Sequence, residues 1–381
     1  MSSRKPKKKK SNGLLIVLLV LITILAVFIA VIIRVALTTG EDSGPGFIRR
    51  TLMPETRSEP TTSTRTEALT GVEHYNPLTG ETMDLGLTNF RPVAIVLNNI
   101  SDSLPHNGVA DADIIYEYPV EGGLTRMLAL YQDISEVEMV GSIRSARHYT
   151  VQLAASYDAI LVGAGRSQQA QSEVSSLGVP FLNEVEGPLR DVFFRDRSRI
   201  PGRRVDNLHA VVTTGERLMQ WLPEYDFRLI HEAHYEHLLS FTDDATPVNG
   251  SNANQVIARL SSGKSSTFYY DAEKGTYHMQ QYNRDFIDAN DDSRPGFANV
   301  LILKTSVSNI AGDTSGRLNV NTTGTGDGYF INGGKYIEIT WSRNSVSSPF
   351  YYTLRDGTPL KLGIGKTFVC ITPTNLDPSF E

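Results

Sequence analysis

Residues 91–97 read RPVAIVL, and residues 113–120 read DIIYEYPV. Short apolar runs of this kind are typical of buried β-strands. Met127–Tyr131 and Asp158–Val162 have the same character. Four such runs within about seventy residues predict that this part of the chain is built around a sheet.

Helices are predicted between and after these strands. Apolar residues recur every three or four positions after Ser145, which indicates a helix that Ser145 could cap. A second helix is predicted over Ser167–Leu177, since Gly178 is a common residue just after a helix. A third runs from Thr214 to about Leu222. This alternation predicts a mixed α/β domain over residues 74–241.

The remainder of the chain has a different pattern. After residue 267, apolar strand-like runs flank short turns that contain glycine, such as DAEKG at 271–275 and NGG at 332–334. Such spacing indicates hairpins. We therefore predict a β-rich domain over 267–375, preceded by a linker over 242–266 in which Ala253–Leu260 could form a short helix. The expected fold class is α+β.

The N-terminal segment differs from everything after it. Leu14–Ile33 is a run of 20 residues that are apolar except for Thr23, long enough to span about 30 Å of hydrocarbon. Six basic residues precede the run, which places the N-terminus in the cytoplasm. We predict a basic cytoplasmic tail (1–12), a transmembrane helix (13–35) and a flexible stalk (36–73). A cleaved signal peptide is the alternative, although its apolar core is usually shorter.

Charge and cysteine content narrow the class of protein. The 381 residues carry 36 Lys+Arg against 42 Asp+Glu, but beyond Arg34 the balance is 29 against 42, a net charge of −13. Nucleic-acid binding is not expected of so acidic a portion. The single cysteine, Cys370, excludes an internal disulfide and cannot serve as a lipid-anchoring cysteine. We expect a single-pass bacterial membrane protein with most of its chain outside the cytoplasm.

Three polar motifs are candidates for a ligand site. EGGLTR at 121–126 puts a turn between two strands, GSIRSAR at 141–147 leads into a helix, and RDVFFRDRSR at 190–199 concentrates arginines. Arginine makes planar bidentate contacts with carboxylate or phosphate, and internal Arg–Asp or Arg–Glu pairs are the structural alternative. The candidate residues are Glu121, Arg126, Arg144, Arg147, Arg195, Asp196 and Arg199.

No metal or cofactor is expected. His231, His234 and His237 recur at spacing three, which is not the spacing of a zinc-protease motif. Catalytic residues cannot be named from the sequence, and an enzyme is the less favoured class.

Three functions stay open at this point. The first is a non-catalytic envelope protein that binds an anionic ligand or a protein partner through its arginines. The second is a hydrolase of an envelope polymer, which would use carboxylates such as Glu117, Glu121 and Asp196 as acid and base. The third is a scaffold that positions other membrane proteins through its β-rich domain.

The chain resembles the YerB-like family of bacterial proteins, which are predicted lipoproteins without an established biochemical function. The resemblance covers about residues 74–375 and implies two domains, mixed α/β and then β-rich. Family members typically carry a lipid-anchoring cysteine, which the apolar helix replaces here, and where they show Pro-His-Asn-Leu-Tyr this chain reads VDNLH at 205–209. If that family histidine supports an activity, the aspartate at position 206 argues against the same activity in this chain. The motifs that carry the resemblance are NPLTG (76–80), RPVA (91–94), ADIIYE (112–117), EGGLTR (121–126), IRSAR (143–147), FRD (194–196), GYF (328–330), IEITW (337–341) and SP (348–349).

Overall fold

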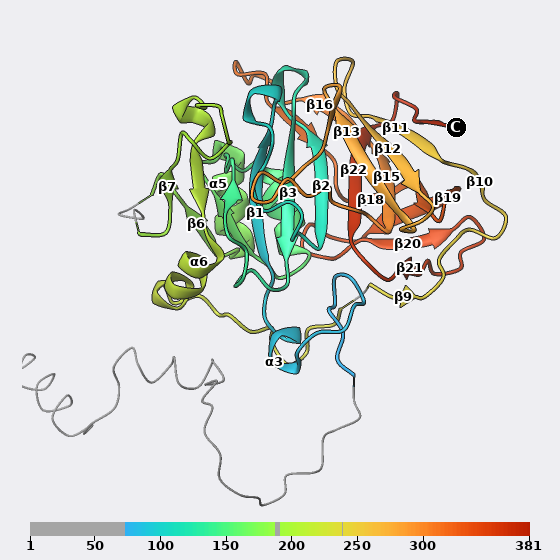
Figure 1. Ribbon diagram of the computed structural model, residues 1–381, viewed down its shortest axis with the longest axis horizontal. Coiled ribbons are helices and arrows are strands. Elements are labelled where there is room, and N and C mark those ends of the chain that lie inside the picture. Colours follow the sequence, from blue (N-terminus) through green and yellow to red (C-terminus); the bar gives the residue numbers. More distant parts are fainter. Residues whose placement is uncertain (1–72, 187–190, 238) are drawn as a thin grey trace, which may run out of the picture. The chain divides into compact units, whose positions relative to one another are not determined.

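A computed structural model describes residues 73–186, 191–237 and 239–381 of the chain. Its largest element is an eleven-stranded sheet with the order β10-β19-β18-β15-β22-β2-β3-β1-β5-β6, in which β20 also pairs with β19 (Figure 1). The strands are β1 (Val93–Asn99), β2 (Ile114–Pro119), β3 (Thr125–Tyr131), β5 (Ile160–Gly163), β6 (Phe181–Asn183), β10 (Ser251–Asn252), β15 (Asn299–Thr305), β18 (Gly324–Asn332), β19 (Lys335–Arg343), β20 (Tyr351–Leu354) and β22 (Thr367–Pro373). The four strands predicted in the first half are confirmed, with bounds shifted by a few residues.

Strand β22 joins the two halves of this sheet. It runs parallel to β15 on one side and parallel to β2 on the other, so that Thr367 lies opposite both Asn299 and Ile114. The chain is therefore mixed α/β and strand-rich, as expected, but its two predicted domains share one continuous sheet. The boundaries at 241 and 267 stay predictions.

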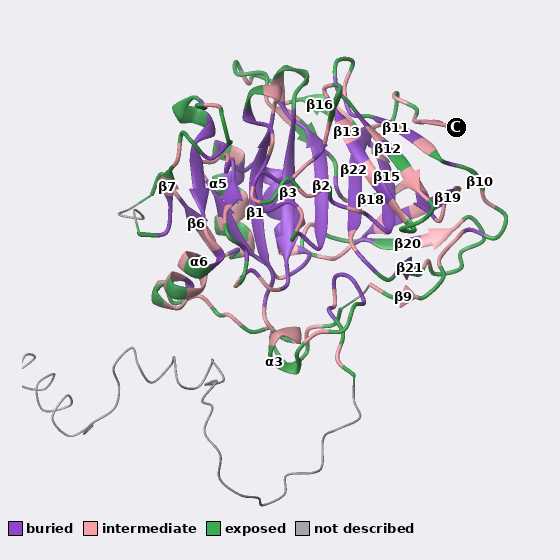
Figure 2. Cartoon of the chain, in the orientation of Figure 1, coloured by how far each residue is buried: buried purple, intermediate pink, exposed green. Residues whose placement is uncertain are grey.

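The central strands β1, β2 and β3 of the large sheet are buried on both faces, whereas β10 at its end is exposed (Figure 2). Along β1, Ile95 and Leu97 belong to one hydrophobic cluster, whereas Ala94 and Val96 belong to another. This alternation follows from the two-residue period of a strand. On the second face Tyr149 packs edge-to-face with Tyr118, with ring centroids 5.4 Å apart.

A five-stranded sheet covers part of the first face. Its order is β14-β13-β12-β11-β23, and Phe268 of β12 packs against Phe368 of β22 with ring centroids 5.1 Å apart. The segment predicted as a linker contains β10 and β11, so the short helix over Ala253–Leu260 is wrong. Val256 and Ala258 are buried while their neighbours are less so, which is the period of a strand. The strands are β11 (Gln255–Arg259), β12 (Ser265–Asp271), β13 (Thr276–Gln281), β14 (Arg284–Asp285) and β23 (Ser379–Phe380).

The three predicted helices are present. Ser167 caps α5 by accepting a hydrogen bond from the Ala170 amide, and Gly178 ends it at a φ of 64°. Thr214 caps α6 in the same way. The helix after Ser145 begins later than expected, because Ser145 Oγ instead donates to the Ala164 carbonyl (2.9 Å). The α-helices are α3 (Leu85–Thr88), α4 (His148–Ala155), α5 (Gln168–Leu177) and α6 (Gly215–Trp221).

Short elements connect these layers. The small sheets consist of β4 (Val140–Gly141), β7 (Phe194–Arg195) and β8 (Val211–Thr213), of β9 (Phe241–Thr242) with β21 (Leu362–Gly363), and of β16 (Val307–Asn309) with β17 (Leu318–Val320). The 3₁₀ turns are η1 (Ser101–Ser103), η2 (Glu121–Gly123), η4 (Asn207–His209) and η5 (Leu222–Tyr225).

The predicted tail (1–12), transmembrane helix (13–35) and stalk (36–73) lie outside the described residues, apart from Glu73. Within the described part of the chain, no helix combines the length and apolar character needed to cross a membrane.

Candidate functional site

The segment 143–147 brings the second arginine motif to the edge of the large sheet. The Arg144 amide donates to the Val96 carbonyl of β1 (2.9 Å), and the Arg144 carbonyl accepts from the Ala164 amide after β5 (3.0 Å). The segment is thus held beside the carboxyl ends of two parallel strands. This is the edge at which open α/β sheets commonly bind ligands.

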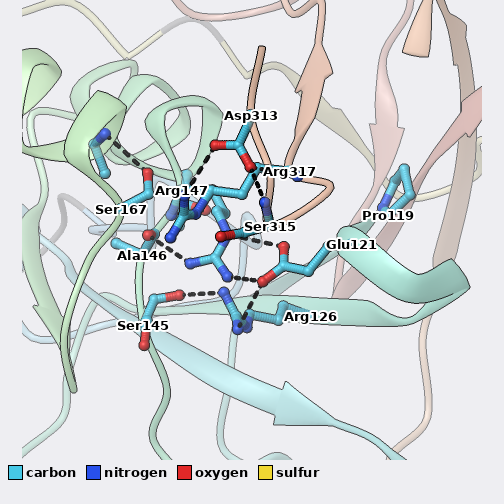
Figure 3. A network of polar contacts seen from close by, with 12 residues as sticks. Pro119, Glu121, Arg126, Ser145, Ala146, Arg147, Ser167, Asp313, Ser315 and Arg317 are labelled. Carbon is cyan, nitrogen blue, oxygen red and sulfur yellow. Dashed lines mark hydrogen bonds and ion pairs between the residues drawn. The ribbon is translucent and has the colours of Figure 1, made fainter. Parts of the chain in front are cut away.

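Arg147 and Glu121 form an ion pair at this edge (Figure 3). Arg147 Nε donates to Glu121 Oε2 (3.1 Å), and Nη2 contacts the other carboxylate oxygen, so the contact is bidentate. Arg126 Nη2 lies 3.9 Å from Glu121 Oε1, and Arg126 Nη1 donates to the Ser145 carbonyl (2.7 Å). The structure therefore brings together Glu121, Arg126 and Arg147 from two different motifs.

Arg144 lies in the same place but has no such partner. In residues 73–186, 191–237 and 239–381, no hydrogen bond or ion pair is made by its guanidinium, and its Nε is buried without a partner. Burial lowers the pKa of Arg144, and the charge of Arg147 lowers it further. We call Glu121, Arg126, Arg144 and Arg147 the arginine cluster.

The pKa shifts show that positive charge is in excess in the arginine cluster. Burial, followed by the charge of Arg147, lowers the pKa of Arg126 to about 10. Burial alone would raise the pKa of Glu121, but hydrogen bonding and attraction from Arg147 outweigh it, and the pKa is lowered. Glu121 is thus ionised at neutral pH, and the cluster contains one negative carboxylate and three positive guanidinium groups.

Arg195 lies at the rim of the arginine cluster. Its positive charge contributes to the lowered pKa of Arg144. Arg195 Nη2 pairs with Glu184 at 2.8 Å, and Nη1 donates to the Asn207 carbonyl (2.9 Å). The side chain is 38% exposed and is therefore accessible from solvent.

The other two candidates of the third motif have local partners. Arg199 is buried, and all three of its side-chain nitrogens donate, to the carbonyls of His209, Pro105 and Ser103 and to Asn107 Oδ1. Asp196 Oδ1 accepts from the amide and hydroxyl of Ser198 (2.8 and 2.7 Å). Arg199 therefore ties loops together and Asp196 forms a turn, and we do not assign either to the arginine cluster.

Two protein-family models match this chain, one after the other along the sequence. One is described as "Protein of unknown function (DUF3048) N-terminal domain" over residues 78–227, and the other as the C-terminal domain of the same family over 256–369. The chain is also 30% identical over 302 residues to "Putative lipoprotein YerB" of Bacillus subtilis (strain 168), covering 78% of this chain and 86% of that protein. The chain belongs to the DUF3048 family.

A solved structure agrees with this assignment. The crystal structure of the YerB protein from Bacillus subtilis superposes on this DUF3048 chain with a TM-score of 0.69 at 26% identity, covering 81% of this chain and all of that one. The resemblance to the YerB-like family that the motifs indicated is confirmed, and so is the strand-rich, mixed α/β fold.

The sequence motifs did not single out several polar residues near the arginine cluster of this DUF3048 chain. Asn98, at the end of β1, donates to His209 Nδ1 (2.9 Å). Burial and then the charge of Arg144 lower the pKa of His209. Asn183, at the end of β6, keeps a buried Nδ2 without a partner in the described residues. A sequence signal existed for Asn98, because Asn98-Asn99 ends an otherwise apolar strand.

The segment 205–209, where the sequence resemblance predicts a departure from the family pattern, lies beside this region. Asp206 Oδ1 accepts from the Leu208 amide (3.0 Å) and so caps η4, which carries His209. In this DUF3048 chain the aspartate therefore has a local structural role.

The loop between β16 and β17 approaches the same region from the C-terminal domain. His148 Nε2, directly after Arg147, lies 3.0 Å from Asn319 Oδ1 of β17. Figure 3 shows the nearby turn that carries Asp313 and Arg317, which pair with each other at 2.9 Å. The Asp313 carboxylate already has a partner and does not neutralise Arg144.

Glu117, a carboxylate considered for hydrolysis, is entirely buried between the two DUF3048 domains. It pairs with Lys264 Nζ at 2.9 Å and accepts hydrogen bonds from Asn99 and Thr125. Ser266 Oγ donates to its second oxygen (2.6 Å). Every oxygen of Glu117 has a partner, which is the arrangement of a structural ion pair.

The described residues offer no set of side chains for a metal ion. Among the described residues, no three His, Cys, Asp or Glu side chains lie close enough together to hold a metal ion. The chemistry available at the arginine cluster is hydrogen-bond donation and positive charge.

Proposed function

We propose that this DUF3048 chain binds an anionic group of an envelope ligand or protein partner at the arginine cluster, with Arg195 assisting from the rim. The single observation that carries the proposal is Arg144, whose Nε is buried and lacks a partner within the described residues. An unpartnered, partly buried charge costs free energy unless a ligand compensates it. A bound carboxylate or phosphate would supply that compensation.

The guanidinium groups also suit such a ligand chemically. Arginine stays protonated at neutral pH and presents planar pairs of N–H donors that match the two oxygens of a carboxylate or phosphate. Arg126 and Arg147 are fixed by Glu121 and by backbone carbonyls, which holds their donors in place. Preorganised donors lose little entropy when a ligand binds.

We also propose that residues 13–35 hold the chain in a bacterial cell membrane, with the folded part on the outer side. The run of 20 residues at Leu14–Ile33 and the preceding basic residues support this topology. The relative named as a lipoprotein would reach the same surface by another anchor. Protease added to intact cells is expected to digest the folded part and to spare a tag at the N-terminus.

The hydrolase alternative has weaker support. Glu117 is fully buried and paired, Glu121 is held by arginines, and Asp196 lies in its own turn. A pair of catalytic carboxylates would have to face one cleft about 5–10 Å apart.

The binding proposal is tested by titrating the full-length protein with inorganic phosphate and, separately, with succinate. We expect a saturable rise in the melting temperature, because a ligand that binds only the native state stabilises it. Arg144→Ala should abolish the rise, whereas Arg259→Ala, which removes an exposed arginine of β11, should leave it intact. No saturable effect with either anion, or an equal effect in Arg144→Ala, would contradict the proposal.

A further inference from the structure

The five-stranded sheet carries a polar hollow that is separate from the arginine cluster. Its volume is about 500 Å³, which is within the range of small-molecule sites. No residue of the arginine cluster lines it. The lining residues that matter for recognition are Tyr269, Asp271, His278, Gln280, Asp285 and Arg294.

Strand geometry explains why these side chains gather on one face. Tyr269 of β12 lies opposite His278 of β13, and Gln280 of β13 lies opposite Asp285 of β14. Their strand neighbours Phe268 and Met279 point inward and are completely buried. Tyr269, Asp271, His278, Gln280 and Asp285 therefore belong to the outer face of the sheet, whereas Arg294 comes from the segment between β14 and β15 and is held by Asp285.

Tyr269 presents an exposed aromatic surface in this hollow. The residue is 39% exposed, although a large apolar ring in a strand would usually pack against its neighbours. An exposed aromatic ring surrounded by polar groups offers an apolar platform with hydrogen-bonding groups at its edges.

Those polar groups alternate donors with acceptors. His278 Nε2 lies 3.3 Å from Asp271 Oδ2, Gln280 Nε2 donates to Asp285 Oδ1 (2.7 Å), and Arg294 pairs with Asp285 Oδ2. A hydroxyl group both donates and accepts hydrogen bonds, so it can join such pairs on either side. The carboxylates of Asp271 and Asp285 would repel phosphate or nucleic acid.

We propose that this hollow binds a glycan chain of β-1,4-linked pyranose units. The apolar C–H face of one sugar ring lies on Tyr269, and its hydroxyls bond to Asp271, Gln280, Asp285 and Arg294. A β-1,4-linked chain is a flat ribbon, which fits the surface of strands better than the curved chain of an α-1,4-linked glucan. This site does not depend on the anion-binding proposal, because the two share no residue.

The test is titration of the full-length protein with chitotetraose, cellotetraose and maltotetraose, in a zwitterionic detergent that has no sugar headgroup. We expect at least one of the two β-linked sugars to bind with a Kd of about 1 mM or below, and maltotetraose to bind more weakly. Tyr269→Ala should weaken binding at least about tenfold. Tyr269→Phe keeps the ring and should retain binding.

Tyr351→Ala is the matched control, because Tyr351 is 45% exposed on β20 and does not line the hollow. Its affinity should equal that of the unmodified protein. Absence of saturable binding by both β-linked sugars, or binding that Tyr269→Ala leaves unchanged, would overturn the proposal. Equal affinity for maltotetraose would overturn the assignment to β-1,4-linked chains.

Discussion

Arg144 and Arg147 are three positions apart, yet their surroundings differ. Arg147 is buried and forms a bidentate pair with Glu121, whereas the Arg144 guanidinium has no partner in the part of the chain that the structure describes. At the scale of the residue, the distinction between a structural and a ligand-binding arginine therefore depends on which contacts are already made.

Alanine substitutions should separate these two roles. Arg147→Ala leaves Glu121 without its main partner and should lower the free energy of unfolding by about 1.5–3 kcal/mol. Arg144→Ala removes an uncompensated charge, so stability without ligand should be unchanged or higher. Denaturant unfolding of the full-length proteins measures both. A loss in Arg144→Ala as large as that in Arg147→Ala would indicate a structural role for Arg144.

His106 should make stability depend on pH. It is completely buried, and its Nε2 donates to the Asn98 carbonyl (2.5 Å), while Nδ1 is buried without a partner in the described residues. Protonation would place an unpaired charge there, and burial lowers the pKa of His106 from 6.5 to about 4. The unfolded chain binds a proton at higher pH than the folded one, so stability falls as pH decreases from about 6.5 to about 4.

The size of this loss should be up to about 3 kcal/mol. Burial raises the pKa of Asp113 to about 6, which gives a slope of opposite sign between about 3.8 and 6. Comparison with His106→Gln isolates the histidine, because Asp113 is present in both proteins. If the free energy of unfolding had the same pH dependence in the unmodified protein and in His106→Gln, His106 would not be the cause of the loss.

At the scale of the element, α6 is placed by a glycine at its first position. The Gly215 amide donates to the Val137 carbonyl (2.8 Å), and a Cβ at Gly215 would lie 1.9 Å from the Ile134 carbonyl oxygen. The helix therefore starts directly against the backbone of another segment.

This contact predicts a large difference between two glycine substitutions. Gly215→Ala forces α6 away from residue 134 and should lower the free energy of unfolding by about 2–4 kcal/mol, as other overpacked sites do. Gly86→Ala in α3 has open space around it and should raise stability by up to about 1 kcal/mol. Denaturant unfolding decides, and a tolerated Gly215→Ala would show that the helix can move at little cost.

The sequence predicted the helices and strands better than it predicted which side chains pair with one another. The apolar runs at 91–97 and 113–120 and the helix-ending Gly178 identified β1, β2 and α5, because strand burial and helix termination are local properties. The helix predicted over 253–260 was wrong because the apolar residues in this eight-residue segment fit both the 3.6-residue period of a helix and the two-residue period of a strand. The pairing of Glu121 with Arg147 was an open alternative, and the absence of a partner for Arg144 depends on long-range packing that no local pattern encodes.

At the scale of the whole molecule, the two family domains are joined by β22 and by a buried ion pair. Lys264 and Glu117 come from different domains and are both almost inaccessible. Lys264→Met should lower the free energy of unfolding by about 3–5 kcal/mol, because it leaves a buried carboxylate without its cation. Adding Glu117→Gln should recover part of the loss. Denaturant unfolding of the single and double variants measures this coupling, and additive losses would contradict it.

The shared sheet also predicts that both domains unfold together. The chain has two tryptophans, Trp221 in the first domain and Trp341 in the second. In Trp341→Phe the fluorescence reports on the first domain, and in Trp221→Phe it reports on the second. Within each variant, the fluorescence and far-UV circular dichroism transitions should coincide. Separate midpoints within one protein would show that the domains unfold independently.

Strand β22 has a consequence for the order of biosynthesis. It follows every other strand of the large sheet in the sequence, yet it occupies a central position between β15 and β2. During synthesis, the strands on both sides exist before the strand that joins them, and their unpaired edges stay open until residue 373 has left the ribosome. The nascent chain therefore exposes two aggregation-prone sheet edges, with unpaired backbone N–H and C=O groups, until late in translation. We expect chaperones that shield such edges to bind it.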